Sequence, residues 1–196
     1  KMDFDGLVLA PMFNVEAEPL IQYCDEHKIP YVFLNSDIPA VKNKAYYGPD
    51  LFQSGCMLAQ MSKYLVHADE EILLVHISKE MERQHHLLRK EEGILHYMQT
   101  HKMKHKLHKV QIRDTDYQTI QKSLLKVLST REIRLIVVTN SRVSSVARFL
   151  EEHKREDIYL LGFDYLPDNI AYLAKGVIDF LICHKPIAQG YQSVMS

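Results

Sequence analysis

The feature that most constrains the fold is a regular alternation of short apolar runs with segments of helical spacing. Continuous apolar runs between turn residues are typical of strands buried on both faces. Because strands that alternate with helices form parallel sheets covered by helices on both sides, the sequence predicts an α/β fold. The expected strands are residues 5–11, 31–35, 45–48, 71–77, 108–113, 133–140, 158–164 and 179–184. The expected helices are residues 15–28, 52–67, 79–101, 116–130, 142–154 and 167–176.

Polar residues stand where several of these strands end. Asn35, Asn140, Asp164 and His184 each occupy the carboxyl end of an expected strand. Parallel sheets bind ligands outside this edge. Taken singly, Asp164 could instead cap the helix at 167–176, and Asn140 could cap the helix that follows it. Their common location favours a small-molecule site, in which a few polar groups orient the ligand.

Aromatic and apolar residues near the same strand ends could form the walls of such a site. The expected wall residues are Met12, Phe13, Phe163 and Tyr165. Hydrogen-bonding groups set among walls of this kind suit a polyhydroxy compound, because a carboxylate accepts two hydroxyls and an amide both donates and accepts.

Motifs for several other chemistries are missing. The chain has no glycine-rich phosphate loop and no GxSxG elbow, so we expect neither a nucleotide cofactor nor a serine hydrolase. The eleven histidines lack a zinc-ligand pattern, and we expect no metal site and no catalytic residues. The basic run at 102–109 is explained by a solvated helix end. With a net charge of −1, the chain as a whole has no basic footprint for nucleic acid.

The cysteines and the hydropathy bear on the compartment. Cys24, Cys56 and Cys183 are odd in number and widely spaced, which suits reduced thiols better than a disulfide framework. No apolar run has the length of a membrane span, and residues 1–5 do not resemble a signal peptide. We therefore expect a cytoplasmic protein with no membrane partner.

An ordered series of motifs resembles LacI-type transcription regulators and periplasmic sugar-binding proteins over essentially the whole chain. The series is DGLVLAP, IPYVFLN, YYGPDLFQSGCMLAQMSKYL, IVVTN, LLGFD and DFLICHKPIAQGYQSV. The resemblance implies a two-lobed type I periplasmic-binding-protein-like fold, which holds a sugar or related effector between its lobes. It also implies a partial amino-terminal lobe at 1–48, a carboxyl-terminal lobe at 49–182, and a crossover back at 183–196.

The resemblance also implies ligand-binding positions. On the amino-terminal lobe these are Phe13, Asn14 and Asn35. On the other lobe and the crossover they are Asn140, Asp164 and His184. The family has an arginine three residues before a helical glycine, and here that position is Lys90, with Arg89 beside it. A lysine would not supply the bidentate fork of an arginine, and His184 stands where the family often has glutamine.

The function that the resemblance implies is effector binding by a LacI-type regulator. The implied partners are a sugar-like effector, operator DNA through a headpiece outside this chain, and a second copy in a homodimer. One alternative is a periplasmic sugar receptor for an ABC transporter or a membrane sensor. An enzyme on the same sheet is a third hypothesis, but no nucleophile–base pair stands at the strand ends.

Overall fold

The computed structural model describes residues 4–11, 14–38, 41, 44–79 and 85–195. The chain forms two compact units. The smaller unit comprises Lys1–Asp50 with His184–Ser196, and the larger unit comprises Leu51–Cys183.

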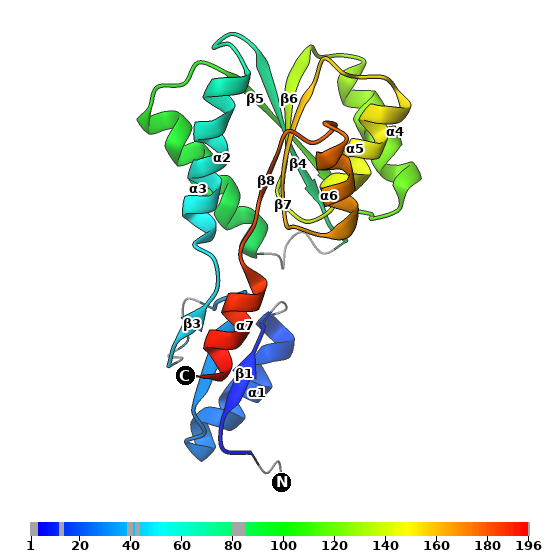
Figure 1. Ribbon diagram of the computed structural model, residues 1–196. Helices are drawn as coiled ribbons and strands as arrows, with labels where there is room; N and C mark the ends of the chain where they lie inside the picture. Colours follow the sequence, from blue (N-terminus) through cyan, green and yellow to red (C-terminus); the bar gives the residue numbers. More distant parts are fainter. Residues whose placement is uncertain (1–3, 12–13, 39–40, 42–43, 80–84, 196) are drawn as a thin grey trace. The chain divides into compact units, whose positions relative to one another are not determined.

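The larger unit is built on a five-stranded parallel sheet in the order β5-β4-β6-β7-β8. Its strands are β4 (Glu71–Ile77), β5 (Lys106–Ile112), β6 (Ile133–Val138), β7 (Tyr159–Phe163) and β8 (Phe180–Ile182). Its helices are α2 (Leu51–Leu65), α3 (His85–Thr100), α4 (Tyr117–Leu128), α5 (Val143–Glu152) and α6 (Pro167–Ala174). Helices α2 and α3 cover one face of the sheet, and α4, α5 and α6 cover the other (Figure 1). This is the α/β architecture that the alternating pattern predicts.

The position of each strand in the sheet explains its sequence. The central strands β4, β6 and β7 are buried almost throughout, because helices cover both of their faces. The edge strand β5 instead has only one fully buried residue, Ile112, and its Lys106, Lys109 and Gln111 are exposed. At the opposite edge, Phe180 of β8 is 42% exposed.

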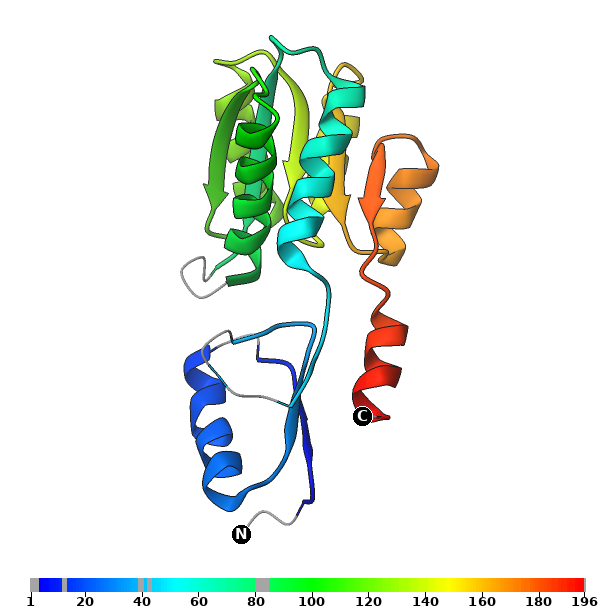
Figure 2. The same cartoon turned by 90° about the vertical axis from the view of Figure 1, so that its left-hand side faces the viewer.

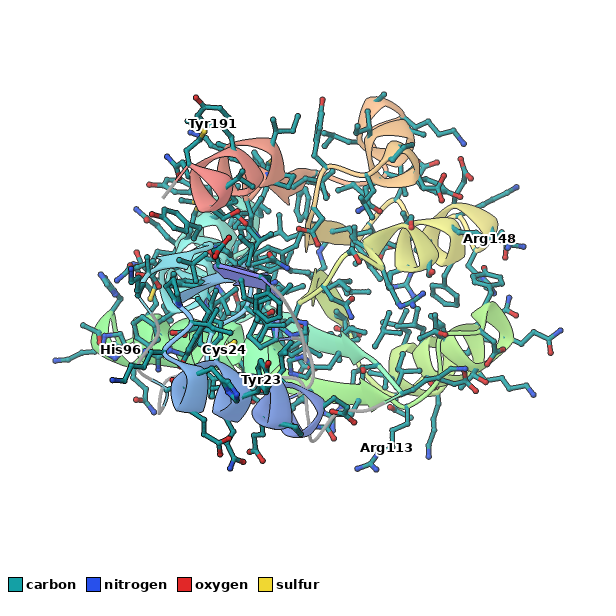
Figure 3. All side chains as sticks on the ribbon, turned by 90° about the horizontal axis from the view of Figure 1, so that it is seen from below. Tyr23, Cys24, His96, Arg113, Arg148 and Tyr191 are labelled. Atoms are coloured by element: carbon teal, nitrogen blue, oxygen red, sulfur yellow. The ribbon has the colours of Figure 1, made fainter. Side chains whose placement is uncertain are left out.

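The smaller unit has a three-stranded parallel sheet in the order β1-β2-β3. Its elements are β1 (Leu7–Leu9), α1 (Asn14–His27), β2 (Tyr31–Leu34), β3 (Tyr46–Tyr47) and α7 (Pro186–Val194). Ile21 and Cys24 of α1 pack with Phe33 of β2 in its core. Helix α7 contacts β2 and β3, and Tyr191 projects from α7 into solvent (Figure 3).

The prediction that the first strand is buried on both faces is wrong. Val8 in the middle of β1 is 41% exposed. Among the described strands, β1 pairs only with β2 and so lies at the edge of its sheet. Val8 lines a surface hollow together with Tyr47 and Val194.

Histidines end three of the helices by one repeated arrangement. Each lies four residues after an aromatic residue, stacks on that ring, and brings its Nδ1 within 2.9–3.0 Å of the aromatic residue's carbonyl oxygen. The pairs are Tyr23–His27, Tyr97–His101 and Phe149–His153, with ring centroids 4.1, 3.8 and 4.2 Å apart. The carbonyl oxygens of Tyr97 and Phe149 also accept from the backbone N–H of His101 and His153, so each ring nitrogen adds a second contact at a helix end.

Two negative findings apply to the described residues. No group of three or more histidine, cysteine, aspartate or glutamate side chains among them could hold a metal ion. None of the helices in the described ranges combines the length and apolarity needed to cross a membrane.

Helices α2 and α3 cross at two glycines, and Figure 2 shows them side by side along the sheet. A Cβ atom on Gly55 would lie 2.0 Å from the carbonyl oxygen of Lys90. A Cβ atom on Gly93 would lie 2.0 Å from the carbonyl oxygen of Phe52. Only glycine allows this approach, so the crossing fixes how α3 sits against its neighbour.

Replacing Gly55 with alanine should destabilise the protein, because the added methyl group forces the two backbones apart. We expect the free energy of unfolding to fall by about 1–3 kcal/mol, as for other overpacked sites. Gly190→Ala in α7 is the control, since no atom lies within 4 Å of its added Cβ, and it should be neutral or stabilising by up to about 1 kcal/mol. Urea unfolding measures both, and equal small effects would contradict the close crossing.

Candidate functional site

Asn140 and Asp164 lie at the same edge of the larger unit's sheet. Strands β6 and β7 are parallel neighbours, with Ile136 opposite Leu160. Asn140 follows the end of β6, and Asp164 directly follows β7. The prediction that these two residues share one edge is confirmed.

Asn140 joins the ends of two strands. Its Nδ2 donates to the carbonyl oxygen of Ile77, the last residue of β4, over 2.6 Å. Its Oδ1 accepts from the backbone N–H of Arg142 at 3.3 Å. Arg142 itself occupies the N-cap position of α5 and makes no capping bond with its side chain. Asn140 therefore orders the turn before α5 while remaining only partly buried.

Asp164 does not cap the helix that follows it. The N-cap residue of α6 is Leu166, so the capping alternative for Asp164 is wrong. Asp164 adopts a left-handed backbone conformation, with φ of 70°, and its N–H donates to Ile182 over 3.0 Å. Burial raises the pKa of the Asp164 carboxyl group, and the positive charge of Lys90 acts against this rise.

Lys90 extends from α3 to the ends of the same strands. The residue is 3% exposed, and its Nζ donates to the carbonyl oxygen of Thr139 over 2.9 Å. The Nζ also lies 3.7 Å from the ring centroid of Phe163, within the range of a cation–π contact. Burial lowers the pKa of Lys90 to about 8, and the charge of Asp164 acts in the opposite direction.

Phe163 is not an open wall of the site, contrary to expectation. Its side chain is fully buried in the core between the sheet and helices α2 and α3, with the ammonium of Lys90 over its ring. Tyr165, by contrast, is 59% exposed. Met12 and Phe13 lie outside the described residues.

Arg89 faces a different direction from Lys90. Its guanidinium group bonds Glu92 over 2.6 Å and lies 4.9 Å from the ring centroid of Phe52 on α2. Lys90 is therefore the member of this predicted pair that lies among the strand ends. A ligand-binding role for Arg89 stays a prediction.

The remaining predicted ligand positions belong to the smaller unit. Asn14 is the first residue of α1. Asn35 follows β2 with φ of 63°, and its N–H donates to Tyr47 over 2.9 Å. The carbonyl oxygen of His184 accepts a hydrogen bond from the side chain of Gln189. The ligand-binding roles of these residues stay predictions.

Sequence reasoning missed Asn169, which holds two of the strand-end loops. Its side chain is completely buried in the first turn of α6. Its Nδ2 lies 2.9 Å from the carbonyl oxygen of Asp164, 3.2 Å from that of Phe163 and 3.1 Å from that of Ser141. Its Oδ1 accepts from the N–H of Ser144 at 3.2 Å. An asparagine early in a helix is common, so no signal in the sequence distinguishes this one.

Sequence reasoning also missed His76 and Thr139, which lie beneath the site. Both residues are completely buried, and His76 Nδ1 is 2.6 Å from the hydroxyl oxygen of Thr139. They stand inside the apolar runs 71–77 and 133–140, where a single polar residue gives no sign of its partner.

The profile of one family, described as the periplasmic binding protein domain, matches residues 1–196. The chain belongs to this family. No curated protein sequence matches this chain.

Solved structures share its fold. A protein assigned as a LacI transcriptional regulator from Bacteroides fragilis is 24% identical, with a TM-score of 0.83 over 97% of this chain and 67% of that chain. GanP, a glucose-galactose binding protein from Geobacillus stearothermophilus, is 22% identical, with a TM-score of 0.83 over 98% of this chain and 69% of that chain. The periplasmic component of an ABC-type sugar transport system from Hahella chejuensis is 18% identical, with a TM-score of 0.85 over 99% of this chain and 71% of that chain.

Lys90 should make stability depend on pH in the alkaline range. Its pKa is about 8 in the folded protein and 10.5 in an unperturbed lysine, so the unfolded state binds more protons between these values. Relative to Lys90→Met, the wild-type free energy of unfolding should therefore rise between pH 8 and 10.5, by on the order of 3 kcal/mol. Urea unfolding of both proteins across this range measures the difference between their free energies of unfolding. A difference that does not change with pH would contradict the lowered pKa of Lys90 in the folded protein.

Asn169→Asp should unfold the protein more easily, because a carboxylate would face three carbonyl oxygens in place of an amide donor. We expect a loss of about 3 kcal/mol at pH 7. The loss should shrink in acid, where a protonated aspartate regains one donor. Melting curves of wild type and variant at pH 5 and pH 7 test this, and a pH-independent difference would rule out the donor role.

Proposed function

We propose that this domain binds a sugar or a related neutral polyhydroxy compound at the carboxyl edge of the larger unit's sheet. The observation that carries the proposal is the convergence of Lys90, Asn140 and Asp164 from α3, β6 and β7. An ammonium donates to hydroxyl oxygens, a carboxylate accepts from two hydroxyls, and an amide does both. We assign no catalytic step to this site.

The local charges favour a neutral ligand over an anionic one. The Lys90 ammonium is already bonded to the Thr139 carbonyl oxygen and lies close enough to the carboxyl group of Asp164 for each to shift the other's pKa. An acidic sugar would bring a second negative charge toward Asp164, which costs free energy at short range. A neutral sugar brings hydroxyl groups and no such repulsion.

We further propose that the domain belongs to a LacI-type transcriptional regulator in the cytoplasm. The fold shared with the Bacteroides fragilis protein supports this, as do three cysteines that form no disulfide. In this proposal the sugar is an effector that shifts a conformational equilibrium of the full-length protein. The output is binding of a homodimer to operator DNA.

A sugar receptor for an ABC transporter or a membrane sensor is the second candidate. GanP and the Hahella chejuensis protein share the fold equally well, and both are described as sugar-binding or sugar-transport components. The two candidates differ in DNA binding. A regulator should bind its own promoter region with an affinity that falls steeply with salt and changes when sugar is added. A receptor should show no such sugar response.

Asp164→Asn tests the sugar site. A melting-temperature screen of neutral aldoses and ketoses with the full-length protein first identifies a ligand, since a bound ligand raises apparent stability. Calorimetric titration should then show an affinity about tenfold to a hundredfold weaker for Asp164→Asn, because a hydrogen bond to a charged group contributes roughly 1.5–3 kcal/mol. Asp168→Asn, one turn away and exposed, is the matched control and should bind as wild type does. Unchanged affinity in Asp164→Asn, with an unchanged melting temperature, would contradict a ligand contact by the Asp164 carboxylate.

A further inference from the structure

A chain of buried polar groups lies beneath the strand ends and reaches Lys90. The side chain of His76, on the inner strand β4, has no solvent exposure. Its Nε2 lies 2.8 Å from Glu91 Oε2, and its Nδ1 lies 2.6 Å from Thr139 Oγ1. The carbonyl oxygen of Thr139 then accepts from Lys90 Nζ at 2.9 Å. Because Lys90 and Glu91 are consecutive residues of α3, this series of hydrogen bonds forms a closed ring.

The surroundings of His76 decide which ring nitrogen carries the proton. The charged groups that face it are Glu91 from α3 and Lys109 from β5. Lys109 Nζ lies 2.8 Å from one oxygen of Glu91 and 2.7 Å from the other, so this carboxylate is ionised and can only accept. The Nε2 of His76 must therefore carry a proton, and this N–H donates a hydrogen bond to Glu91 Oε2.

The hydrogen bond to Thr139 then has a defined direction. Burial lowers the pKa of His76, so the ring is neutral at pH 7 and its Nδ1 is an acceptor. The Thr139 hydroxyl consequently donates to Nδ1 over 2.6 Å rather than to the Val75 carbonyl oxygen at 3.4 Å. The ring thus fixes the rotamer of Thr139, the residue whose carbonyl holds Lys90.

We propose that His76 and Thr139 are positioning residues at the ligand-binding edge: they set the Lys90 ammonium, and also Asn140, which follows Thr139 in the chain. Neither residue is exposed to solvent, so both act through Lys90 and Asn140. The value of this arrangement for sugar binding rests on the proposed function, but the positioning of Lys90 does not.

The experiment uses Thr139→Val, which keeps the shape of the side chain and removes its hydroxyl, with Thr139→Ser as the conservative rescue. Nitrogen-15 NMR of histidine- and lysine-labelled protein at pH 7 reports the His76 tautomer and the Lys90 ammonium without any ligand. We expect a protonated Nε2 and a bare Nδ1 in wild type. The His76 Nδ1 and Lys90 Nζ signals should both move in Thr139→Val and return in Thr139→Ser.

Glu91→Gln provides a second route if Thr139→Val does not fold. A glutamine amide can donate to Nε2, which would allow the proton to move to Nδ1 and reverse the Thr139 bond. The Lys90 signal should again shift. A wild-type ring protonated on Nδ1, or a Lys90 signal that is unchanged in every folded variant of Thr139 and Glu91, would overturn the proposal.

Calorimetry separates this inference from the proposed function. With a sugar identified by the melting screen, Thr139→Val should bind about tenfold more weakly, and Thr139→Ser within about threefold of wild type. If the Lys90 signal responds as expected but no neutral sugar binds to wild type, the positioning stands and the proposed ligand fails. If sugar binds equally to wild type and Thr139→Val, the positioning has no role in recognition and that part of the proposal fails.

Discussion

The buried ammonium of Lys90 is the group on which the geometry of the strand-end site depends. Removing a charged amine from water is costly, and the folded protein offsets the cost with a carbonyl oxygen, an aromatic face and a nearby carboxyl group. These partners come from the ends of β6 and β7, so the lysine ties α3 to both strands. The carbonyl of Lys90 in turn presses against Gly55 of α2, which leaves its backbone no room to move toward α2.

The strand ends are held by side chains because regular backbone hydrogen bonding stops there. Buried backbone groups need partners, and a loop cannot supply them as a sheet does. Asn169 meets this need between β6 and β7, where it bonds three carbonyl oxygens and one N–H. His76 and Asn140 act between β4 and β6. Because a half-satisfied polar network is costly, these residues favour a single arrangement of the edge.

Membership of the periplasmic binding protein domain family does not decide between a regulator and a receptor. The same scaffold is found in the Bacteroides fragilis protein and in the sugar-binding GanP at nearly equal identity and TM-score. A shared fold is weak evidence of function, since function depends on particular sites grafted on it. The arrangement of Lys90 and Asp164 is therefore a better basis for the proposed ligand than the overall likeness of fold.

The sequence by itself determined the fold class, the order of strands and helices, and the common edge of Asn140 and Asp164. Those features follow from hydrophobic periodicity and from the rule that parallel strands end at the same side, both of which are local or general. The sequence also indicated Lys90, together with its neighbour Arg89, through the spacing from Gly93 and a family resemblance. Only the tertiary structure decided that Arg89 turns toward Phe52, that Phe163 is buried under Lys90, and that Val8 is exposed on an edge strand. It alone paired His76 with Thr139, 63 residues away, and placed Asn169 under two loops. Such contacts depend on which distant segments a fold brings together, and no local pattern of residue types encodes that.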